Sequence, residues 1–141
     1  MTMGTVGRTL AALCALIACI GCGRRFTEDL AFQAPKGWIY SAVPGGGEVW
    51  VKSGGSNESI MAQATEIPLP QRQPGWKDIT ICGNHPAVLM VQTNNPGQIW
   101  EALSTTWGPE RYMAVYVRPV NAAPDPNAEA AIRTLCVKNR D

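Results

Sequence analysis

The chain has 141 residues, and its twelve Lys and Arg nearly balance eleven Asp and Glu, which gives a formal net charge of +1. Affinity for nucleic acid depends on clustered cationic contacts, so we expect no nucleic-acid partner. Hydrophobic residues make up 45% of the chain and five of them are tryptophans, which predicts a folded domain rather than a disordered chain.

The first 18 residues are typical of a bacterial lipoprotein signal peptide. An apolar run from Thr9 to Ala18 follows Arg8 and ends in small residues, which is the layout of a secretory signal. A helix needs about 20 apolar residues to cross a bilayer, whereas Arg24 and Arg25 end this run too early. We therefore favour a lipoprotein signal over a permanent transmembrane helix or a signal cleaved without lipidation.

The sequence Leu16-Ile17-Ala18-Cys19 resembles a lipobox, in which the cysteine is acylated, typically with palmitate, and becomes the new N-terminus. Cys22 is the alternative acylation site. Its preceding residues match a lipobox less well, but its lipidation would leave an even pair of cysteines in the mature protein. We expect residues 1–18 to be the signal peptide and residues 19–28 a tether to the cell membrane or outer membrane. The protein would lie on the extracytoplasmic (periplasmic) face.

Residues 29–141 are expected to form a single α+β domain. Short stretches of alternating or β-branched residues separated by Gly, Pro and Asn predict strands. The prolines of residues 67–75 predict a surface loop. The predicted strands cover residues 30–34, 38–40, 48–52, 60–66, 79–82, 87–92, 99–107 and 111–118.

A helix is predicted at the C-terminal end. Asp125 is a suitable N-cap and is followed by Pro126, a residue favoured in the first helical turn. Ala128, Ile132, Leu135 and Cys136 have the spacing of one helix face. Strands followed by a single helix predict an antiparallel sheet of about five to seven strands packed by that helix.

Three segments of the chain resemble the PsbP/DcrB-like families. The segment from Phe32 to Trp38 is similar to their apolar-x-x-Pro-x-Gly-Trp opening, and Ile81 to Ala87 resembles the turn that enters a central strand. The tyrosine-rich strand from Tyr112 to Tyr116 and the helix ending at Leu135 are similar to their usual close. The resemblance implies a curved antiparallel sheet, export or lipid anchoring, and a non-enzymatic accessory or adaptor role. The proline-rich stretch from Pro68 to Pro74 departs from it, because these families often have a helix there.

Cys82 and Cys136 are the remaining cysteines of the mature domain. In an oxidising compartment the default expectation for such a pair is a disulfide. The bridge would join the strand that precedes His85 to the C-terminal helix. The alternative is that both are small buried residues that never meet.

An envelope enzyme using a Cys82/His85 pair is an alternative function. Such a nucleophile needs the thiolate beside the imidazole and a third group to orient the ring, and no neighbouring residue supplies one. A zinc site at the same residues would need two further ligands. We therefore expect no catalytic residue, no metal and no cofactor.

Four tryptophans are candidates for a recognition surface, because Trp is enriched at binding hot spots. Trp38, Trp76, Trp100 and Trp107 lie near the ends of predicted strands. Their alternative role is to fill the core, which is also the role expected of Trp50. The sequence thus predicts a non-catalytic binding or adaptor domain for an envelope protein or a small apolar ligand. A purely structural envelope protein is the other alternative.

Overall fold

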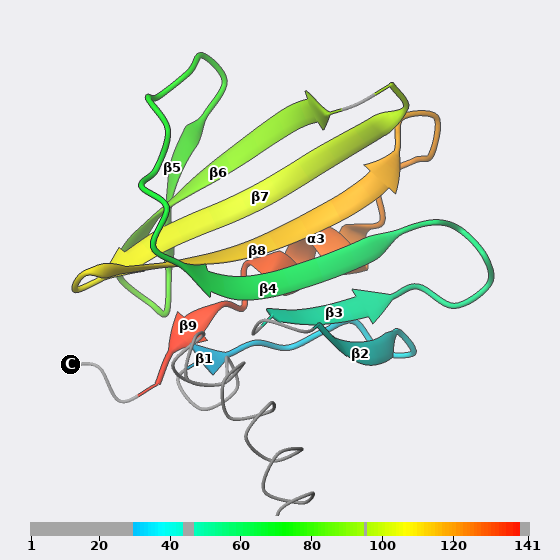
Figure 1. Cartoon of the computed structure of the whole chain (residues 1–141), viewed down its shortest axis with the longest axis horizontal. Helices are drawn as coiled ribbons and strands as arrows, with labels where there is room; N and C mark the ends of the chain where they lie inside the picture. The colour runs from blue at the N-terminus through cyan, green and yellow to red at the C-terminus, as the bar shows by residue number, and fades with distance from the viewer. Residues whose placement is uncertain (1–29, 44–46, 95, 139–141) are drawn as a thin grey trace, which may run out of the picture.

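A computed structural model describes residues 30–43, 47–94 and 96–138 (Figure 1). The predicted signal peptide, the tether and both candidate acylation sites, Cys19 and Cys22, lie outside the described residues. The domain that follows consists mainly of β-strands, with one short helix among the described residues.

Seven antiparallel strands form a curved sheet, which confirms the predicted sheet (Figure 1). In space their order is β2-β3-β4-β8-β7-β6-β5. Two meanders, β2 to β4 and β5 to β8, therefore meet where β4 pairs with β8. The strands are β2 (Ile39–Val43), β3 (Gly47–Val51), β4 (Ser59–Thr65), β5 (Lys77–Ile81), β6 (His85–Asn94), β7 (Gln98–Trp107) and β8 (Glu110–Pro119).

The sheet buries apolar side chains on both faces, because alternate residues of a strand point to opposite sides. We call one side the helix face, since its buried cluster includes Ile60, Leu103 and Tyr116 together with residues of the helix. The opposite side, the open face, carries a second cluster that includes Met90 and Val115. Residues 66–76 connect β4 to β5 without regular structure, as their prolines predict.

The helix α3 (Pro126–Ile132) begins as predicted. The Asp125 carboxylate accepts a hydrogen bond from the backbone N–H of Asn127 at 2.8 Å, and Pro126 follows in the first turn. Ala128, Ala131 and Ile132 are buried in the helix-face cluster. Figure 1 shows α3 beside β8, which is the strand it contacts most.

The predicted end of the helix is wrong. The helix was expected to continue through Leu135 to Cys136, but α3 stops at Ile132. The backbone N–H of Thr134 bonds to the carbonyl of Ala131, three residues earlier, and the Thr134 hydroxyl accepts a bond from the backbone N–H of Gln33 at 2.9 Å. These contacts tighten the last turn and redirect the chain, a common way for a helix to end.

Beyond the helix, β9 (Cys136–Val137) pairs with β1 (Leu30–Ala31) in a separate antiparallel ladder. Leu30 lies opposite Val137, so the first and last strands of the domain are neighbours. The predicted first strand, residues 30–34, is thus shortened to two residues. The chain leaves β1 toward a turn in which Gly37 has a φ of 87°, a conformation that glycine adopts without a Cβ clash.

Candidate functional site

Cys82 and Cys136 lie together in the structure, which confirms their predicted pairing. Their sulfur atoms are within disulfide-bonding distance and their Cα atoms are 5.5 Å apart, a usual separation for a disulfide. The expected location of Cys136 is wrong, because this residue belongs to β9 and not to α3. The bridge therefore ties the residue after β5 to the β1–β9 ladder.

His85 is the first residue of β6 and has structural contacts on two sides. Its Nε2 lies 2.8 Å from the carbonyl oxygen of Thr106. Its ring stacks on the indole of Trp107, with 3.4 Å between ring centroids. Because the sulfur of Cys82 is joined to Cys136, the hypothetical Cys82/His85 nucleophile has no thiol in this structure. Within the described ranges, no three His, Cys, Asp or Glu side chains form a group suited to a metal ion.

The four candidate tryptophans divide between the two faces of the sheet. Trp38 and Trp107 are partly buried against the helix-face cluster. Trp76 is buried in the open-face cluster, and Trp100 packs against the same cluster. The four side chains therefore do not form one recognition surface.

A cavity of about 420 Å³ lies on the helix face, between β1 and β3. Its volume falls in the range of sites for small molecules, about 300–1,000 Å³. Trp50 of β3 and Phe32 form an aromatic wall, with 5.0 Å between their ring centroids. The residues that line the cavity are Leu30, Ala31, Phe32, Gln33, Glu48, Trp50, Thr134 and Lys138.

The aromatic wall continues onto the edge strand. Tyr40 of β2 lies opposite Trp50 in the sheet register, and their rings are 5.5 Å apart between centroids. Two aromatic rings in such a tilted arrangement contribute free energy in addition to that gained from burying their apolar area. Trp50 is therefore held on two sides, by Phe32 and by Tyr40, and its ring orientation is fixed next to the cavity.

Glu48 is the acidic residue that lines this cavity, beside the polar residues Gln33, Thr134 and Lys138. It precedes Trp50 by two residues in β3, so both side chains are on the same face of the sheet. The residue is 8% exposed. Its Oε1 accepts a hydrogen bond from the Tyr40 hydroxyl at 3.0 Å, whereas Oε2 is buried without a hydrogen-bond partner. Lys138 also lines the cavity but does not bond to Oε2.

An unpaired buried acceptor costs about 1–3 kcal/mol, and more when the group is charged. Buried polar groups in native proteins therefore almost always have a partner, from the protein, from water or from a ligand. A ligand with a hydrogen-bond donor would therefore satisfy Oε2 of Glu48 in this cavity. Its apolar and aromatic walls add a preference for a ligand with an apolar body.

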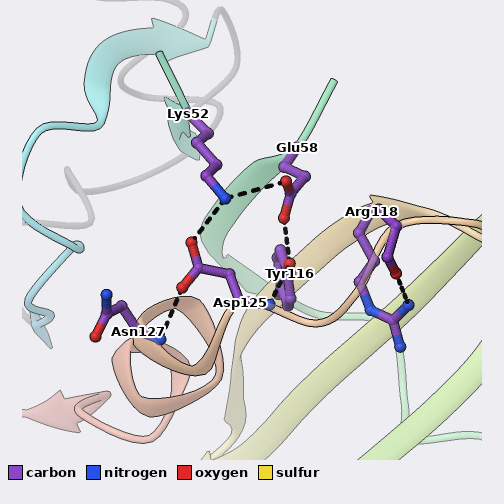
Figure 2. Close-up of polar contacts among 7 residues, drawn as sticks. Lys52, Glu58, Tyr116, Arg118, Asp125 and Asn127 are labelled. Carbon is purple, nitrogen blue, oxygen red and sulfur yellow. Dashed lines mark hydrogen bonds and ion pairs between the residues drawn. The ribbon is translucent and has the colours of Figure 1, made fainter. Parts of the chain in front are cut away.

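A second polar cluster on the helix face joins the β3–β4 hairpin to the start of α3 (Figure 2). The Lys52 ammonium lies 3.0 Å from Oδ2 of Asp125 and 3.2 Å from Oε2 of Glu58. The Tyr116 hydroxyl donates to Oε1 of Glu58 and accepts a bond from the backbone N–H of Asp125 at 3.0 Å. We call these four residues the Lys52 network.

The charged groups and the hydroxyl of the Lys52 network all have partners within the protein. Burial alone would raise the pKa of Asp125, but hydrogen bonds from Lys52 and from the backbone N–H groups of Asn127 and Ala128 hold this pKa below its ordinary value. Burial and the bond to Glu58 raise the pKa of the Tyr116 hydroxyl, so the phenol keeps its proton. The network fixes α3 to the sheet and offers no reactive group.

A third polar contact also links the sheet to α3. Glu101 of β7 is 6% exposed and lies 3.3 Å from the guanidinium of Arg118. Burial and a hydrogen bond with Glu129 of α3 raise the pKa of Glu101, against the opposing effect of Arg118. This contact places Glu129 of α3 beside Glu101 of β7.

Sequence reasoning missed Glu48, although one signal was present. In Glu48-Val49-Trp50 the alternation places a charged side chain on the same face as a tryptophan that was expected to be packed. A carboxylate on a buried face is rare unless it is paired. That pattern pointed to a polar group under the surface, but neither Tyr40 nor Phe32 could be placed beside it without the strand pairing.

Comparison with known proteins adds no relative. No protein-family model matches the chain, and no curated protein matches it. In the described part of the chain, no helix has the length and apolar character needed to cross a bilayer.

Proposed function

We propose that the protein is a membrane-anchored extracytoplasmic lipoprotein whose domain binds a ligand without chemically changing it. Its domain would belong with the PsbP/DcrB-like α+β modules, with α3 packed across one face of the sheet, and would act as a binding or adaptor unit in the cell envelope. The observation that carries the binding role is the unpartnered Oε2 of Glu48 in an aromatic cavity. The paired Cys82 and Cys136 suit an oxidising compartment.

The cavity favours a ligand with an apolar body and a protonated amine. A cationic nitrogen supplies the donor that Oε2 of Glu48 lacks, and its charge matches the carboxylate. The faces of Trp50 and Phe32 attract a cation as well, because aromatic rings carry negative charge on their faces. The same amine can be part of a small molecule or a lysine side chain of an envelope protein.

Benzylamine, which is protonated at neutral pH, is a suitable probe of this cavity. We expect it to bind with a Kd on the order of 1 mM, as a good fragment does. The Glu48→Gln variant should bind it at least tenfold more weakly, because the charge of the acceptor is lost. Titration calorimetry on the protein purified with its native N-terminus measures both affinities, and Glu66→Gln, at an exposed position after β4, is the matched control.

The same variant separates binding from folding. Glu48→Gln removes a buried charge but keeps an oxygen to accept from Tyr40, so its free energy of unfolding should equal or exceed that of the wild type. Benzylamine affinity that is the same in Glu48→Gln and in the wild type would contradict the proposed site. So would equal binding of benzyl alcohol, which has the same ring but no positive charge.

Mass spectrometry of the N-terminal peptide from native membranes tests the anchor. We expect a peptide that begins with an acylated Cys19, or with an acylated Cys22 if the second candidate is the lipidated residue. A tryptic peptide that still contains Met1 would show that the segment is not removed, and would overturn the proposed anchoring and location together.

A further inference from the structure

Arg111 is a buried cation with no carboxylate partner among the described residues. It lies in β8 and is 7% exposed. Its neighbour Tyr112 belongs to the helix-face cluster, so by alternation Arg111 points to the open face. The ion pairs that join described residues involve Lys52, Arg72 and Arg118, and none of them includes Arg111.

Neutral groups hold this guanidinium in place. Its Nε donates to the carbonyl oxygen of Ile67 at 2.7 Å, and its Nη1 donates to the hydroxyl oxygen of Ser104 at 3.0 Å. Burial lowers the pKa of Arg111 from its ordinary value, but arginine stays protonated in proteins. The positive charge is thus buried and fixed in direction, without a counter-charge.

A cavity of about 240 Å³ adjoins Arg111 on the open face. Leu69 and Val88 are among its apolar walls, and Ser104 is among its polar ones. The hydrogen bonds of Arg111 to described residues use Nε and Nη1, which leaves Nη2 available to a ligand. The Ser104 hydroxyl accepts from Arg111 and therefore keeps its own hydrogen for donation. The cavity thus offers two donors next to a buried positive charge.

The one acidic residue among the residues that line this cavity is Asp78, and its charge is already matched. Its carboxylate lies 2.8 Å from Nη1 of Arg72, and both side chains are largely exposed. Because Asp78 pairs with Arg72, it does not neutralise Arg111, whose positive charge stays without an ion-pair partner among the described residues. A buried ion without a partner is costly, so an anion that enters should bind there with a gain in free energy.

We propose that this cavity is a binding site for a small organic carboxylate. The carboxylate oxygens would accept from Nη2 of Arg111 and from the Ser104 hydroxyl, the charge-assisted geometry that guanidinium groups favour. The apolar walls would contact the hydrocarbon part of the ligand, which a fully polar anion such as phosphate lacks. The site lies on the open face and is independent of the Glu48 cavity, so either can fail without the other.

Benzoate is the probe, with benzyl alcohol and inorganic phosphate as comparison ligands. On the full chain, titration calorimetry should show saturable benzoate binding that is at least tenfold tighter than binding of either comparison ligand. Arg111→Gln should weaken benzoate binding at least tenfold. Arg133→Gln removes the same charge from an exposed position after α3 and should change the affinity less than twofold.

A second variant guards against loss of the fold. Arg111 also holds Ile67, so Arg111→Gln can loosen residues 66–76. Ser104→Ala leaves that bond in place and should still weaken benzoate binding about fivefold, because it removes one of the two donors to the carboxylate. Benzoate affinity that is unchanged in Ser104→Ala, or in a folded Arg111→Gln, overturns the proposal. Phosphate that binds as tightly as benzoate overturns the assignment to carboxylates.

Discussion

Replacing Cys82 with serine is expected to lower the free energy of unfolding by about 4 kcal/mol. The bridge from Cys82 to Cys136 spans a sequence separation of 54 residues, and closing a loop of that length restricts the unfolded chain by about this amount in the chain-entropy model. Serine is the matched substitution because Cys82 has a positive φ of 53°, and a serine there bears the same backbone strain. Urea unfolding followed by circular dichroism measures the loss.

Two controls isolate the bridge from the side chains. The double variant Cys82→Ser/Cys136→Ser should be no less stable than either single variant, because residues that act as a unit are not additive. The wild type in strong reductant should match the double variant. A reduced wild type as stable as the oxidised protein would show that the bridge contributes nothing to stability.

Truncation of Tyr116 is the second large effect, with an expected loss of about 3–5 kcal/mol for Tyr116→Ala. This side chain is fully buried in the helix-face cluster, and removing a buried aromatic ring leaves a cavity that the neighbours fill poorly. The variant also removes the hydroxyl that joins Glu58 to the backbone of Asp125. The β4 side of the sheet and the start of α3 should therefore loosen together.

Tyr116→Phe separates the hydroxyl from the ring. It keeps the packing but leaves Glu58 and the Asp125 N–H each without one partner, which should cost about 1–3 kcal/mol. Thermal unfolding of both variants beside the wild type provides the comparison. A Tyr116→Phe protein as stable as the wild type would show that the Lys52 network does not depend on this hydroxyl.

The strands and the start of the helix could be predicted because their signals are local. Residue propensity predicted strands at residues 99–107 and 111–118, which are β7 and β8, and Asp125 followed by Pro126 predicted the helix N-terminus. The end of the helix could not be predicted in the same way. One contact at that end joins Thr134 to Gln33 across 101 positions of sequence, and spacing along one segment does not contain that information.

The candidate site was only partly accessible from the sequence for the same reason. The pairing of Cys82 with Cys136 followed from chemistry, because two cysteines in an oxidised domain have few alternatives. Glu48 and Arg111 differ, since each is an ordinary charged residue in a strand until the pairing of strands shows what surrounds it. Glu48 stands out because its buried Oε2 has no hydrogen-bond partner, and Arg111 because it is buried without an ion pair among the described residues. Both properties depend on the tertiary structure.

The pairing of Leu30 with Val137 brings the beginning and the end of the domain to the same place. A short linker can therefore join them, and new ends can be opened in the exposed, proline-rich residues between β4 and β5. Domains whose ends are adjacent commonly tolerate such circular permutation. The permuted domain would place a reporter or an immobilisation point away from the β1–β9 ladder.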